Sequence, residues 1–395
     1  REQNEVACSA ECEKIKGSKN LNVPPLRFPE FTEEWKAEQL DNIATLSKGI
    51  GISKEQLSED GEPCILYGEL YTKYKSEIIK QVESKTDING SKLKRSKAND
   101  VIIPCSGETA VDIATARCVP FDNILFGGDL NVISLHQYDG AFMSYQLNGK
   151  RKYDIARVAQ GVSIVHLYGE HLKAIKTYNP TLPEQQKIAK LLSLLDDRID
   201  TQNKIIEDLK KLKSAISERL FKSVKGFTVL LSDLCDIVKG KQINGENLSD
   251  SGNYYVMNGG TEPSGYYDNY NVEASTISIS EGGNSCGYVQ FNTSPFWSGG
   301  HCYSIQNIAD KVDNMYLYHY LKSNEDAIMK LRIGSGLPNI QKKDLAMFKI
   351  IVPKIEWQIK ISTFLSSLER KAEIEERIQN VMQKQKLYLL QQMFI

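Results

Sequence analysis

The sequence lacks the short motifs that identify many enzymes of phosphate and nucleic-acid chemistry. It has no G-x-x-x-x-G-K-S/T phosphate loop and no H-E-x-x-H metal-binding helix. The tetrapeptide NPTL, which begins at Asn179, does not match the Asn-Pro-Pro-Tyr type of motif used by amino-methyltransferases. His166 and His171 stand five residues apart without a supporting motif, so we interpret them as surface side chains. We therefore predict that this chain carries out no catalysis and binds no cofactor itself.

A cysteine framework, long apolar runs and an excess of charge are also missing. The eight cysteines have no regular spacing, and no histidine or second cysteine pair lies near Cys8 and Cys12, so we expect reduced thiols and no metal site. No apolar run is long enough to span a membrane, and residues 1–23 lack the apolar stretch of a signal peptide, which favours a cytoplasmic protein. The 49 basic and 50 acidic residues nearly cancel, so DNA binding would need local patches or a basic partner.

What the sequence does contain is an internal repeat. Residues 180–199 and 353–372 are two proline-led amphipathic segments that lie 173 positions apart (353 minus 180). Unrelated helices share leucines by chance, but they seldom share a proline, a glutamine and a closing phenylalanine in one register. The chain is therefore predicted to consist of two related halves. At this offset, without a gap, identical residues align: Gly161 with Gly334, Pro180 with Pro353, Gln185 with Gln358, Ile188 with Ile361, Leu192 with Leu365, Leu195 with Leu368, Ile205 with Ile378 and Phe221 with Phe394.

Composition divides each half into a mixed domain followed by a helix. Both mixed regions carry short strand-like runs, such as DVIIPC and STISIS, separated by glycine-rich turns such as SEGGNSCG. This mixture predicts two α+β domains, each with a twisted sheet. The expected segments are a flexible leader at 1–25, a first domain at 26–179, a helix at 180–224, a second domain at 225–352 and a second helix at 353–395.

Apolar residues recur every three or four positions along both helices, which is the pattern of one buried seam. A helix of about 40 residues is about 60 Å long, and a domain of about 120 residues is too small to cover it. We therefore expect the two helices to pair as an antiparallel coiled coil with approximate two-fold symmetry; the alternative is that each helix lies on its own domain. Gln202 and Lys213 occupy seam positions where an apolar residue is expected. The expected pairing residues are Ile188, Leu192, Leu195, Ile199, Ile206, Leu209, Ile361, Leu365, Leu368, Ile378 and Met382.

Two divergent domains held at a fixed separation suit a ligand whose backbone repeats with two-fold symmetry. Double-stranded DNA, with a helical repeat of about 34 Å, is the main candidate. The chain would then read two different half-sites, and the length of the helices would set the gap between them.

The layout from residue 26 onward resembles the specificity (S) subunit of type I restriction-modification enzymes. The resemblance is carried by LRFPEF with a following Trp and Leu, by YGELY at 67–71, by GSGLPNI at 334–340 and by the P-x-L-x-E-Q-like openings of the two helices. Trp357 departs from the pattern, because it replaces the usual glutamate before Gln358. The resemblance implies two target recognition domains separated by antiparallel helices. It also implies two docked methyltransferase (M) subunits that bind S-adenosylmethionine, and a restriction (R) subunit that can join them.

Candidate DNA contacts come from basic and polar-aromatic runs, since Lys and Arg suit phosphates and Asn, Arg and Lys suit base edges. For each basic run the alternative is a solvated charged loop, and the tyrosines at 254–270 would serve equally well in sheet packing. The candidates in the first domain are Lys92, Lys94, Arg95, Lys97, Lys150, Arg151, Lys152 and Arg157. Those in the second domain are Lys241, Tyr266, Tyr267, Asn269, Arg332, Lys342 and Lys343.

The sequence leaves three classes of function open. The main hypothesis is a DNA sequence-recognition subunit that is not an enzyme. The second is a protein scaffold with two interaction domains on a coiled coil that does not read DNA. The third, a self-contained restriction-methylation enzyme, is disfavoured by the missing motifs.

Overall fold

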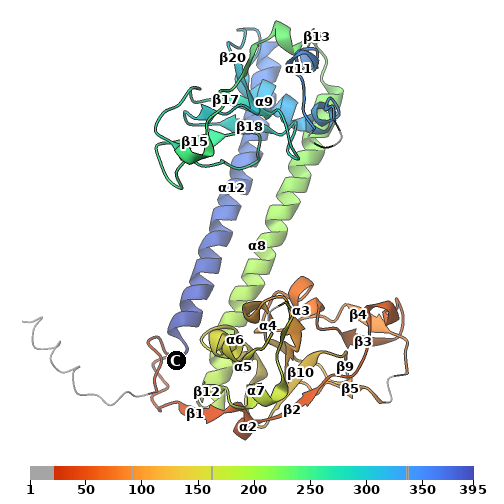
Figure 1. Ribbon diagram of the computed structural model, residues 1–395, viewed down its shortest axis with the longest axis vertical. Helices are drawn as coiled ribbons and strands as arrows, with labels where there is room; N and C mark the ends of the chain where they lie inside the picture. The colour runs from red at the N-terminus through yellow and green to blue at the C-terminus, as the bar shows by residue number, and fades with distance from the viewer. Residues whose placement is uncertain (1–21, 90–91, 162, 335, 337) are drawn as a thin grey trace, which may run out of the picture. The chain divides into compact units, whose positions relative to one another are not determined.

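The fold is described from a computed structural model that covers residues 22–89, 92–161, 163–334, 336 and 338–395. Two compact units make up this part of the chain (Figure 1). The first comprises the described residues up to Gln202 together with 379–395, and the second comprises 203–378. Most of the predicted leader, with Cys8 and Cys12, lies outside the described residues. Within them, no helix is both long and apolar enough to cross a membrane.

The first unit is built around a four-stranded antiparallel sheet in the order β2-β10-β6-β8. A second sheet, in the order β4-β3-β9-β5, contains the parallel pair β3 and β9, and β1 pairs with β12. The elements of this unit are β1 (Lys36–Gln39), α2 (Leu40–Ile43), β2 (Ala44–Lys48), η1 (Lys54–Gln56), β3 (Glu62–Ile65), α3 (Glu69–Thr72), β4 (Ser84–Thr86), β5 (Lys94–Arg95), β6 (Asp100–Pro104), β7 (Ser106–Gly107), α4 (Ala110–Ile113), β8 (Arg117–Val119), β9 (Leu125–Phe126), β10 (Leu130–Leu135), α5 (Gly140–Asn148), α6 (Lys152–Val158), β11 (Val165–His166), α7 (Gly169–Lys173), β12 (Lys176–Asn179) and the first part of α8 (Leu182–Ser223).

The second unit repeats this plan with shorter connections. Its four-stranded sheet has the order β14-β20-β17-β18, its second sheet has the order β16-β15-β19 with β15 and β19 parallel, and β13 pairs with β21. The elements are β13 (Phe227–Leu230), η3 (Leu231–Asp233), β14 (Asp236–Lys239), η4 (Gly245–Asn247), β15 (Tyr254–Met257), β16 (Tyr266–Tyr267), β17 (Thr276–Ser280), β18 (Val289–Asn292), β19 (Trp297–Ser298), β20 (Cys302–Gln306), α9 (Asn314–Ser323), α10 (Glu325–Met329), α11 (Lys342–Ala346), β21 (Lys349–Val352) and most of α12 (Ile355–Gln392).

The shared strand order confirms the prediction of two related α+β halves. A glycine follows the first strand of each main sheet, and in both units the backbone of a second glycine lies in close contact with it. A Cβ on Gly49 would collide with the carbonyl oxygen of Gly127, and a Cβ on Gly240 would collide with that of Gly299. Lys48 precedes Gly49 and Lys239 precedes Gly240, so a Lys-Gly pair ends each of these equivalent strands, because only glycine allows this backbone contact.

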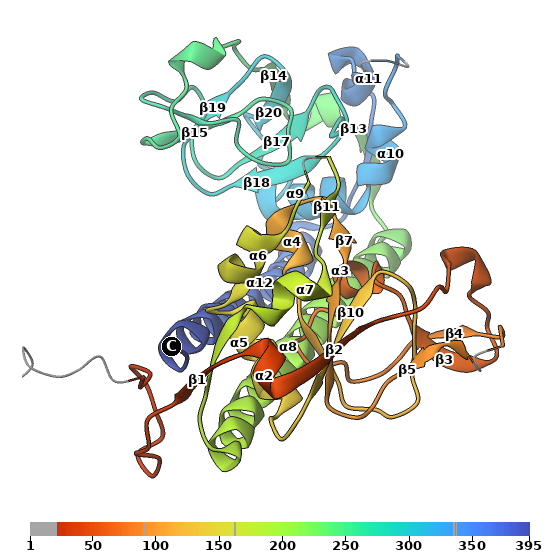
Figure 2. The ribbon, with the colours of Figure 1, turned by 60° about the horizontal axis from the view of Figure 1, so that its bottom comes forward.

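The two long helices pair antiparallel, as predicted. In the first unit the beginning of α8 packs against the end of α12, where Ile188 and Leu192 share a buried cluster with Met393 and Phe394. In the second unit the last part of α8 packs against the beginning of α12, and Phe221 lies in the same core as Ile361 and Leu365. Figure 2 gives a second view of the ribbon of both helices. Each helix therefore contributes to both units, which excludes the alternative that each lies only on its own domain.

Most of the expected pairing residues lie inward, with one exception. Ile188, Leu192, Leu195, Ile199, Ile206, Ile361 and Leu365 are buried, and Leu209, Leu368 and Met382 are half-buried. Ile378 is 39% exposed, contrary to expectation. Nearby on α12, Glu376 forms an ion pair with Lys210 of α8 at 2.5 Å. In this part of the pair, charged side chains join the two helices. The pairing here therefore does not need a continuous apolar seam.

Equivalent phenylalanines near the ends of α8 and α12 generate a matched prediction. Phe394 is fully buried between Trp35 and Phe142 in the first unit, and Phe221 is buried against Tyr316 and Tyr320 in the second. Replacing either phenylalanine with alanine should cost about 3–5 kcal/mol in its own unit, because it leaves a cavity.

Hydrogen exchange on the full chain checks this prediction. Phe394→Ala should speed amide exchange in α5 and leave α9 protected, although α5 precedes the mutation by more than 240 positions in the sequence. Phe221→Ala should do the reverse. The assignment of α12 to both units is wrong if Phe394→Ala leaves exchange in α5 unchanged.

Candidate nucleic-acid interface and helix junctions

A buried glutamine in the first turn of each long helix joins that helix to its domain. Gln185 Nε2 donates to the carbonyl oxygen of Pro180 at 2.8 Å, and its Oε1 accepts from the backbone N–H of Asp139 at 2.9 Å. Gln358 repeats both contacts, with the carbonyl of the proline before its own helix at 2.8 Å and with the N–H of Asp313 at 2.8 Å. Asp139 and Asp313 cap the equivalent helices α5 and α9. The repeated glutamine therefore fixes the start of each long helix against its domain.

A buried tyrosine, carboxylate and lysine link the two helices in the first unit. Tyr145 donates to Asp196 Oδ2 at 2.7 Å, and Lys386 Nζ of α12 lies 2.7 Å from Asp196 Oδ1 and 2.6 Å from Glu77 Oε2. Burial raises the pKa of Asp196. Burial opposes the charge on Lys386, but the carboxylates of Glu77 and Asp196 outweigh it and raise the pKa of this lysine. The group therefore depends on its charges being paired, since an unpaired buried charge is costly.

The second unit contains the same group with the roles of the helices exchanged. Tyr318 donates to Glu369 Oε1 of α12 at 3.2 Å, and Lys213 Nζ of α8 lies 2.5 Å from the same oxygen. Each member lies 173 positions from its counterpart: Tyr318 from Tyr145, Glu369 from Asp196 and Lys386 from Lys213. The lysine that interrupts the predicted seam of α8 is therefore a pairing residue, because it binds a carboxylate on the other helix.

The predicted DNA contacts of the first unit fall into two groups. Lys92, Lys97, Lys150 and Arg157 are exposed, and Lys94 and Lys152 are half-buried. The other two arginines, Arg95 and Arg151, are largely engaged. Arg95 makes a two-pronged ion pair with Glu62 at 2.6 and 3.0 Å, and Arg151 donates to the carbonyl oxygen of Ile395 at 3.1 Å and pairs with Asp154 at 3.1 Å. Roles in DNA binding for this set stay predictions.

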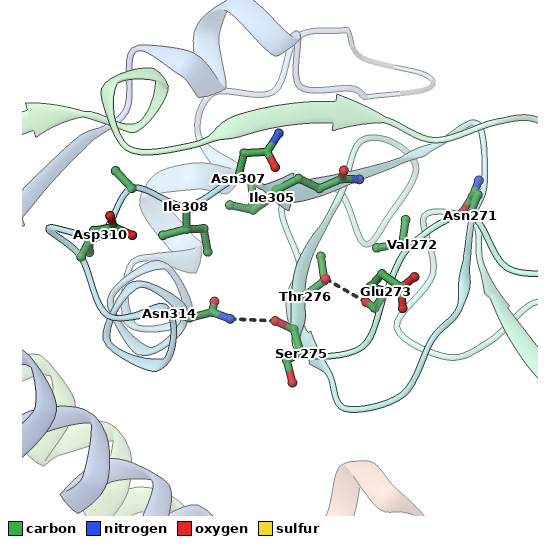
Figure 3. A pocket seen from close by; sticks show the side chains of 13 residues that line it. Asn271, Val272, Glu273, Ser275, Thr276, Ile305, Asn307, Ile308, Asp310 and Asn314 are labelled. Atoms are coloured by element: carbon green, nitrogen blue, oxygen red, sulfur yellow. Dashed lines mark hydrogen bonds between the residues drawn. The ribbon is translucent and has the colours of Figure 1, made fainter.

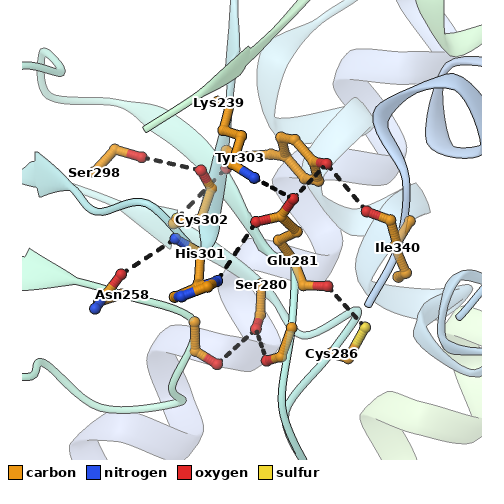
Figure 4. A network of polar contacts seen from close by, with 12 residues as sticks. Lys239, Asn258, Ser280, Glu281, Cys286, Ser298, His301, Cys302, Tyr303 and Ile340 are labelled. Atoms are coloured by element: carbon orange, nitrogen blue, oxygen red, sulfur yellow. Dashed lines mark hydrogen bonds and ion pairs between the residues drawn. The ribbon is translucent and has the colours of Figure 1, made fainter. Parts of the chain in front are cut away.

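The second unit contains a network of polar contacts centred on Glu281 (Figure 4). Glu281 Oε1 accepts from Lys239 Nζ at 2.6 Å and lies 3.0 Å from the hydroxyl of Tyr303, while Nδ1 of His301 is 3.7 Å from Oε2. Burial and the charge of Glu281 raise the pKa of Tyr303, so its hydroxyl stays protonated. The carboxylate therefore holds Lys239 and His301, two largely exposed side chains, at one edge of the sheet.

Loops that carry predicted DNA contacts converge on this network. Lys241 follows the glycine at the end of β14, and its backbone N–H donates to Ser298 O at 2.8 Å. The Tyr303 hydroxyl lies 3.0 Å from Ile340 O, just before α11, which begins with Lys342 and Lys343. Arg332 is exposed on the loop before the bridge that pairs Ile333 with Asn339.

The polar-aromatic cluster lies on β16 and the loop after it. Tyr266 and Tyr267 are half-buried by pairing with β15, Tyr267 packs edge-on against Trp297 at 5.1 Å, and Asn269 is exposed. These tyrosines thus serve at least partly in sheet packing.

Sequence reasoning missed two equivalent lysines. Lys48 and Lys239 end the equivalent strands β2 and β14, and each is held by a carboxylate, with Lys48 Nζ 3.2 Å from Asp129. The hydrogen bond to Asp129 raises the pKa of Lys48, and nearby the ring of Tyr168 stacks on that of His166 with the ring centres 6.1 Å apart. The Lys-Gly pairs in the sequence were the available signal, but they indicate only a strand end until the sheets bring a carboxylate beside each lysine.

One motif and one hollow carry no catalytic assignment. Residues 283–287 (GNSCG) fit the G-x-S-x-G pattern, but they form a turn between β17 and β18 rather than the strand-to-helix elbow that the pattern requires. A hollow of about 470 Å³ between the end of β20 and residues 271–276 is lined by both polar and apolar side chains, and Asn314 donates to the Ser275 carbonyl there at 2.7 Å (Figure 3). Its charged lining residues are Glu273 and Asp310, which do not suit phosphate. Across the described ranges, no group of His, Cys, Asp or Glu side chains is arranged to hold a metal ion.

Comparison with known proteins identifies the family. Residues 32–211 and 226–384 both match the family model of the type I restriction modification DNA specificity domain. The chain belongs to this family. The two matches coincide with the two halves of the internal repeat, so the specificity domain is present twice.

Relatives agree with this assignment, and a solved structure shares the fold. The chain is 34% identical over 122 residues to a putative type I specificity subunit of Mycoplasma genitalium, covering 30% of this chain and 31% of that protein. It is 24% identical over 410 residues to the type I restriction enzyme MjaVIII specificity subunit of Methanocaldococcus jannaschii, covering 91% of each. A crystal structure of a type I restriction-modification S subunit from M. genitalium matches with a TM-score of 0.68 at 20% identity, covering 94% of this chain and 99% of that one. The matched region thus spans less than half of the first relative but nearly all of that solved structure.

A buried histidine makes the stability of the second specificity domain depend on pH. His319 of α9 is hydrogen-bonded through Nε2 to Ser366 Oγ at 2.8 Å, and burial lowers its pKa to about 4. The unfolded chain, with an ordinary histidine pKa of about 6.5, binds this proton more readily. Its contribution is therefore complete above about pH 6.5 and is lost as the pH falls toward 4, by about 2 kcal/mol at pH 5.

His319→Gln should remove this component, because the equivalent position of the first domain is Gln146. Chemical denaturation at pH 7 and pH 5 checks the prediction: the free energy of unfolding should fall less for the variant than for the parent chain. Equal losses in both proteins would show that His319 is protonated equally in the folded and unfolded states.

Proposed function

We propose that this chain is the sequence-recognition subunit of a type I restriction-modification system. Each specificity domain reads one half-site of a bipartite DNA target. The chain performs no catalysis and binds no cofactor; methylation is carried out by two methyltransferase subunits that bind S-adenosylmethionine and dock on it. A restriction subunit can join the complex, and the system acts in the cytoplasm.

The proposal is carried by the two copies of the specificity domain. They share one set of core contacts, here called the frame. They differ in the side chains at the edge of the main sheet, where β2 ends in the first domain and β14 ends in the second. The frame repeats the sheet order, the glutamine contacts and the tyrosine–carboxylate–lysine group. The edges differ: a Lys48–Asp129 pair beside Tyr168 in the first domain, and a Lys239–Glu281 pair beside His301 in the second. Two different edges on one frame suit two different half-sites, because base readout depends on the side chains that a loop presents.

The net charge of the chain supports a DNA-recognition subunit that works together with partner proteins. The formal net charge is −1, so the chain supplies no general attraction for the phosphate backbone. Its exposed lysines at the strand ends are suited to individual phosphate contacts. The remaining neutralisation of the DNA would come from the methyltransferase subunits.

The competing hypothesis is a scaffold that holds partner proteins without reading DNA. Mapping methylated bases across the genome separates the two. Deleting this gene should remove one bipartite methylated motif at all its sites, and complementation with the intact gene should restore it.

A matched variant sharpens the experiment. Lys239→Ala with His301→Ala should reduce methylation of that motif, because both side chains lie at the proposed DNA edge of the second domain. Val381→Ala changes an exposed side chain on α12, away from all predicted DNA contacts, and should leave methylation intact. An unchanged methylome after the deletion would contradict the proposal and favour the scaffold.

A further inference from the structure

One stripe along the beginning of α8 is covered by a segment of the same chain. Glu184, Lys187 and Leu191 lie three and four positions apart, so they share one face of the helix. The segment 22–35 crosses this face, and within it Arg27 Nε pairs with Glu184 Oε1 at 2.7 Å, and Trp35 Nε1 donates to the same oxygen at 3.3 Å.

The middle of the covering segment engages the lysine of the stripe through aromatic rings and a carboxylate. Lys187 Nζ lies 4.5 Å from the ring centre of Phe28 and 5.9 Å from that of Phe31, and it forms an ion pair with Glu30. Phe28 and Leu191 both pack against the buried cluster at this end of α8. An aromatic and acidic segment is therefore the natural occupant of this helix face.

Among the residues that the structure describes, no segment covers the equivalent stripe on α12. At the 173-residue offset Glu184, Lys187 and Leu191 become Trp357, Lys360 and Phe364. The ring of Trp357 is 58% exposed and that of Phe364 is 46% exposed. Two large aromatic side chains seldom remain exposed on one helix face unless that face takes part in an interaction.

The missing cover follows from the connection between α8 and β13. In the first domain, β1 is preceded by the covering segment, whereas in the second only residues 224–226 separate the end of α8 from β13. Phe227, which opens β13 beside Val352, is itself 83% exposed. The second domain thus has an open counterpart of a surface that is filled in the first.

We propose that the stripe formed by Trp357, Lys360 and Phe364 is a docking site for an extended segment of a partner protein that carries aromatic and acidic side chains, as residues 28–31 do in the first domain. In the second domain, Trp357 stands at the position of the glutamate that binds Arg27 in the first. The partner segment therefore needs no arginine opposite this position. The proposal goes beyond reading DNA, and it holds whether or not the half-site assignment is correct.

The charge around the stripe fits such a partner. Lys225, Lys354 and Lys360 are exposed, and no carboxylate in the described part of the chain forms an ion pair with them. Lys360 Nζ instead lies 5.1 Å from the ring centre of Trp357. Glu356 is the acidic residue within this first turn of α12. An acidic aromatic segment would therefore gain both ring contacts and charge pairing, and aromatic residues dominate the energy of such interfaces.

A synthetic peptide with the sequence of residues 24–34, PPLRFPEFTEE, is the probe. Labelled with a fluorophore and titrated with the full chain, it should bind saturably by fluorescence anisotropy. Trp357→Asp and Phe364→Asp should each weaken binding by about tenfold or more, since each removes a ring from the centre of the contact. A peptide with Phe28→Ala and Glu30→Lys should bind more weakly to the unmodified chain.

Control variants show whether the peptide binds at this stripe. Tyr153→Asp, which alters an exposed ring in the first domain, should leave peptide binding unchanged, and circular dichroism should show that all variants are folded. Binding to target DNA should be the same for Trp357→Asp and the parent chain, so failure here is distinct from failure of the proposed function. The proposal is overturned if the peptide does not bind or if Trp357→Asp binds it equally well. It is also overturned if sedimentation shows that the stripe joins two copies of this chain instead.

Discussion

The pairing of α8 with α12 is the contact on which both domains depend. Neither helix can bury its seam within one domain, so each contributes its two ends to two different cores. The apolar side chains supply the stability, at about 1.5–3 kcal/mol for each fully buried large residue. The buried tyrosine–carboxylate–lysine groups contribute in another way: a charge pair adds little net stability, but a shifted register would leave its charges unpaired. The polar groups therefore select the register that the apolar seam stabilises.

The repeat keeps the residues that join helix to domain and varies those that face outward. Gln185 and Gln358 make the same contacts in both halves, whereas Glu184 has become Trp357. Such a division is expected of a duplicated unit whose two copies keep one scaffold while meeting different ligands. The closed helix face of the first domain and the open face of the second represent a divergence of this kind.

Much of the fold could be predicted because it is encoded in local patterns. The helix seams, the strand-like runs at 100–105 and 275–280, and the 173-residue offset each require only neighbouring positions or a simple shift to be recognised. The partners of charged residues could not be predicted in this way. Lys213 reads as a flaw in the seam until the second helix brings Glu369 beside it, and nothing in the basic run around Arg151 indicates that its guanidinium donates to the carbonyl oxygen of Ile395. Lys48 and Lys239 are two among 49 basic residues until the sheets place a carboxylate beside each.

The most direct test of the antiparallel pairing is a pair of insertions between two interhelical ion pairs. Four residues, about one helical turn, inserted after Lys210 alone would displace that lysine from Glu376 or Lys213 from Glu369. A second insertion of four residues after Ala372 would lengthen α12 between the same two pairs and restore both alignments. The account predicts that the single insertion lowers the free energy of unfolding and that the double insertion recovers most of the loss. A double insertion that is no more stable than the single one would contradict it.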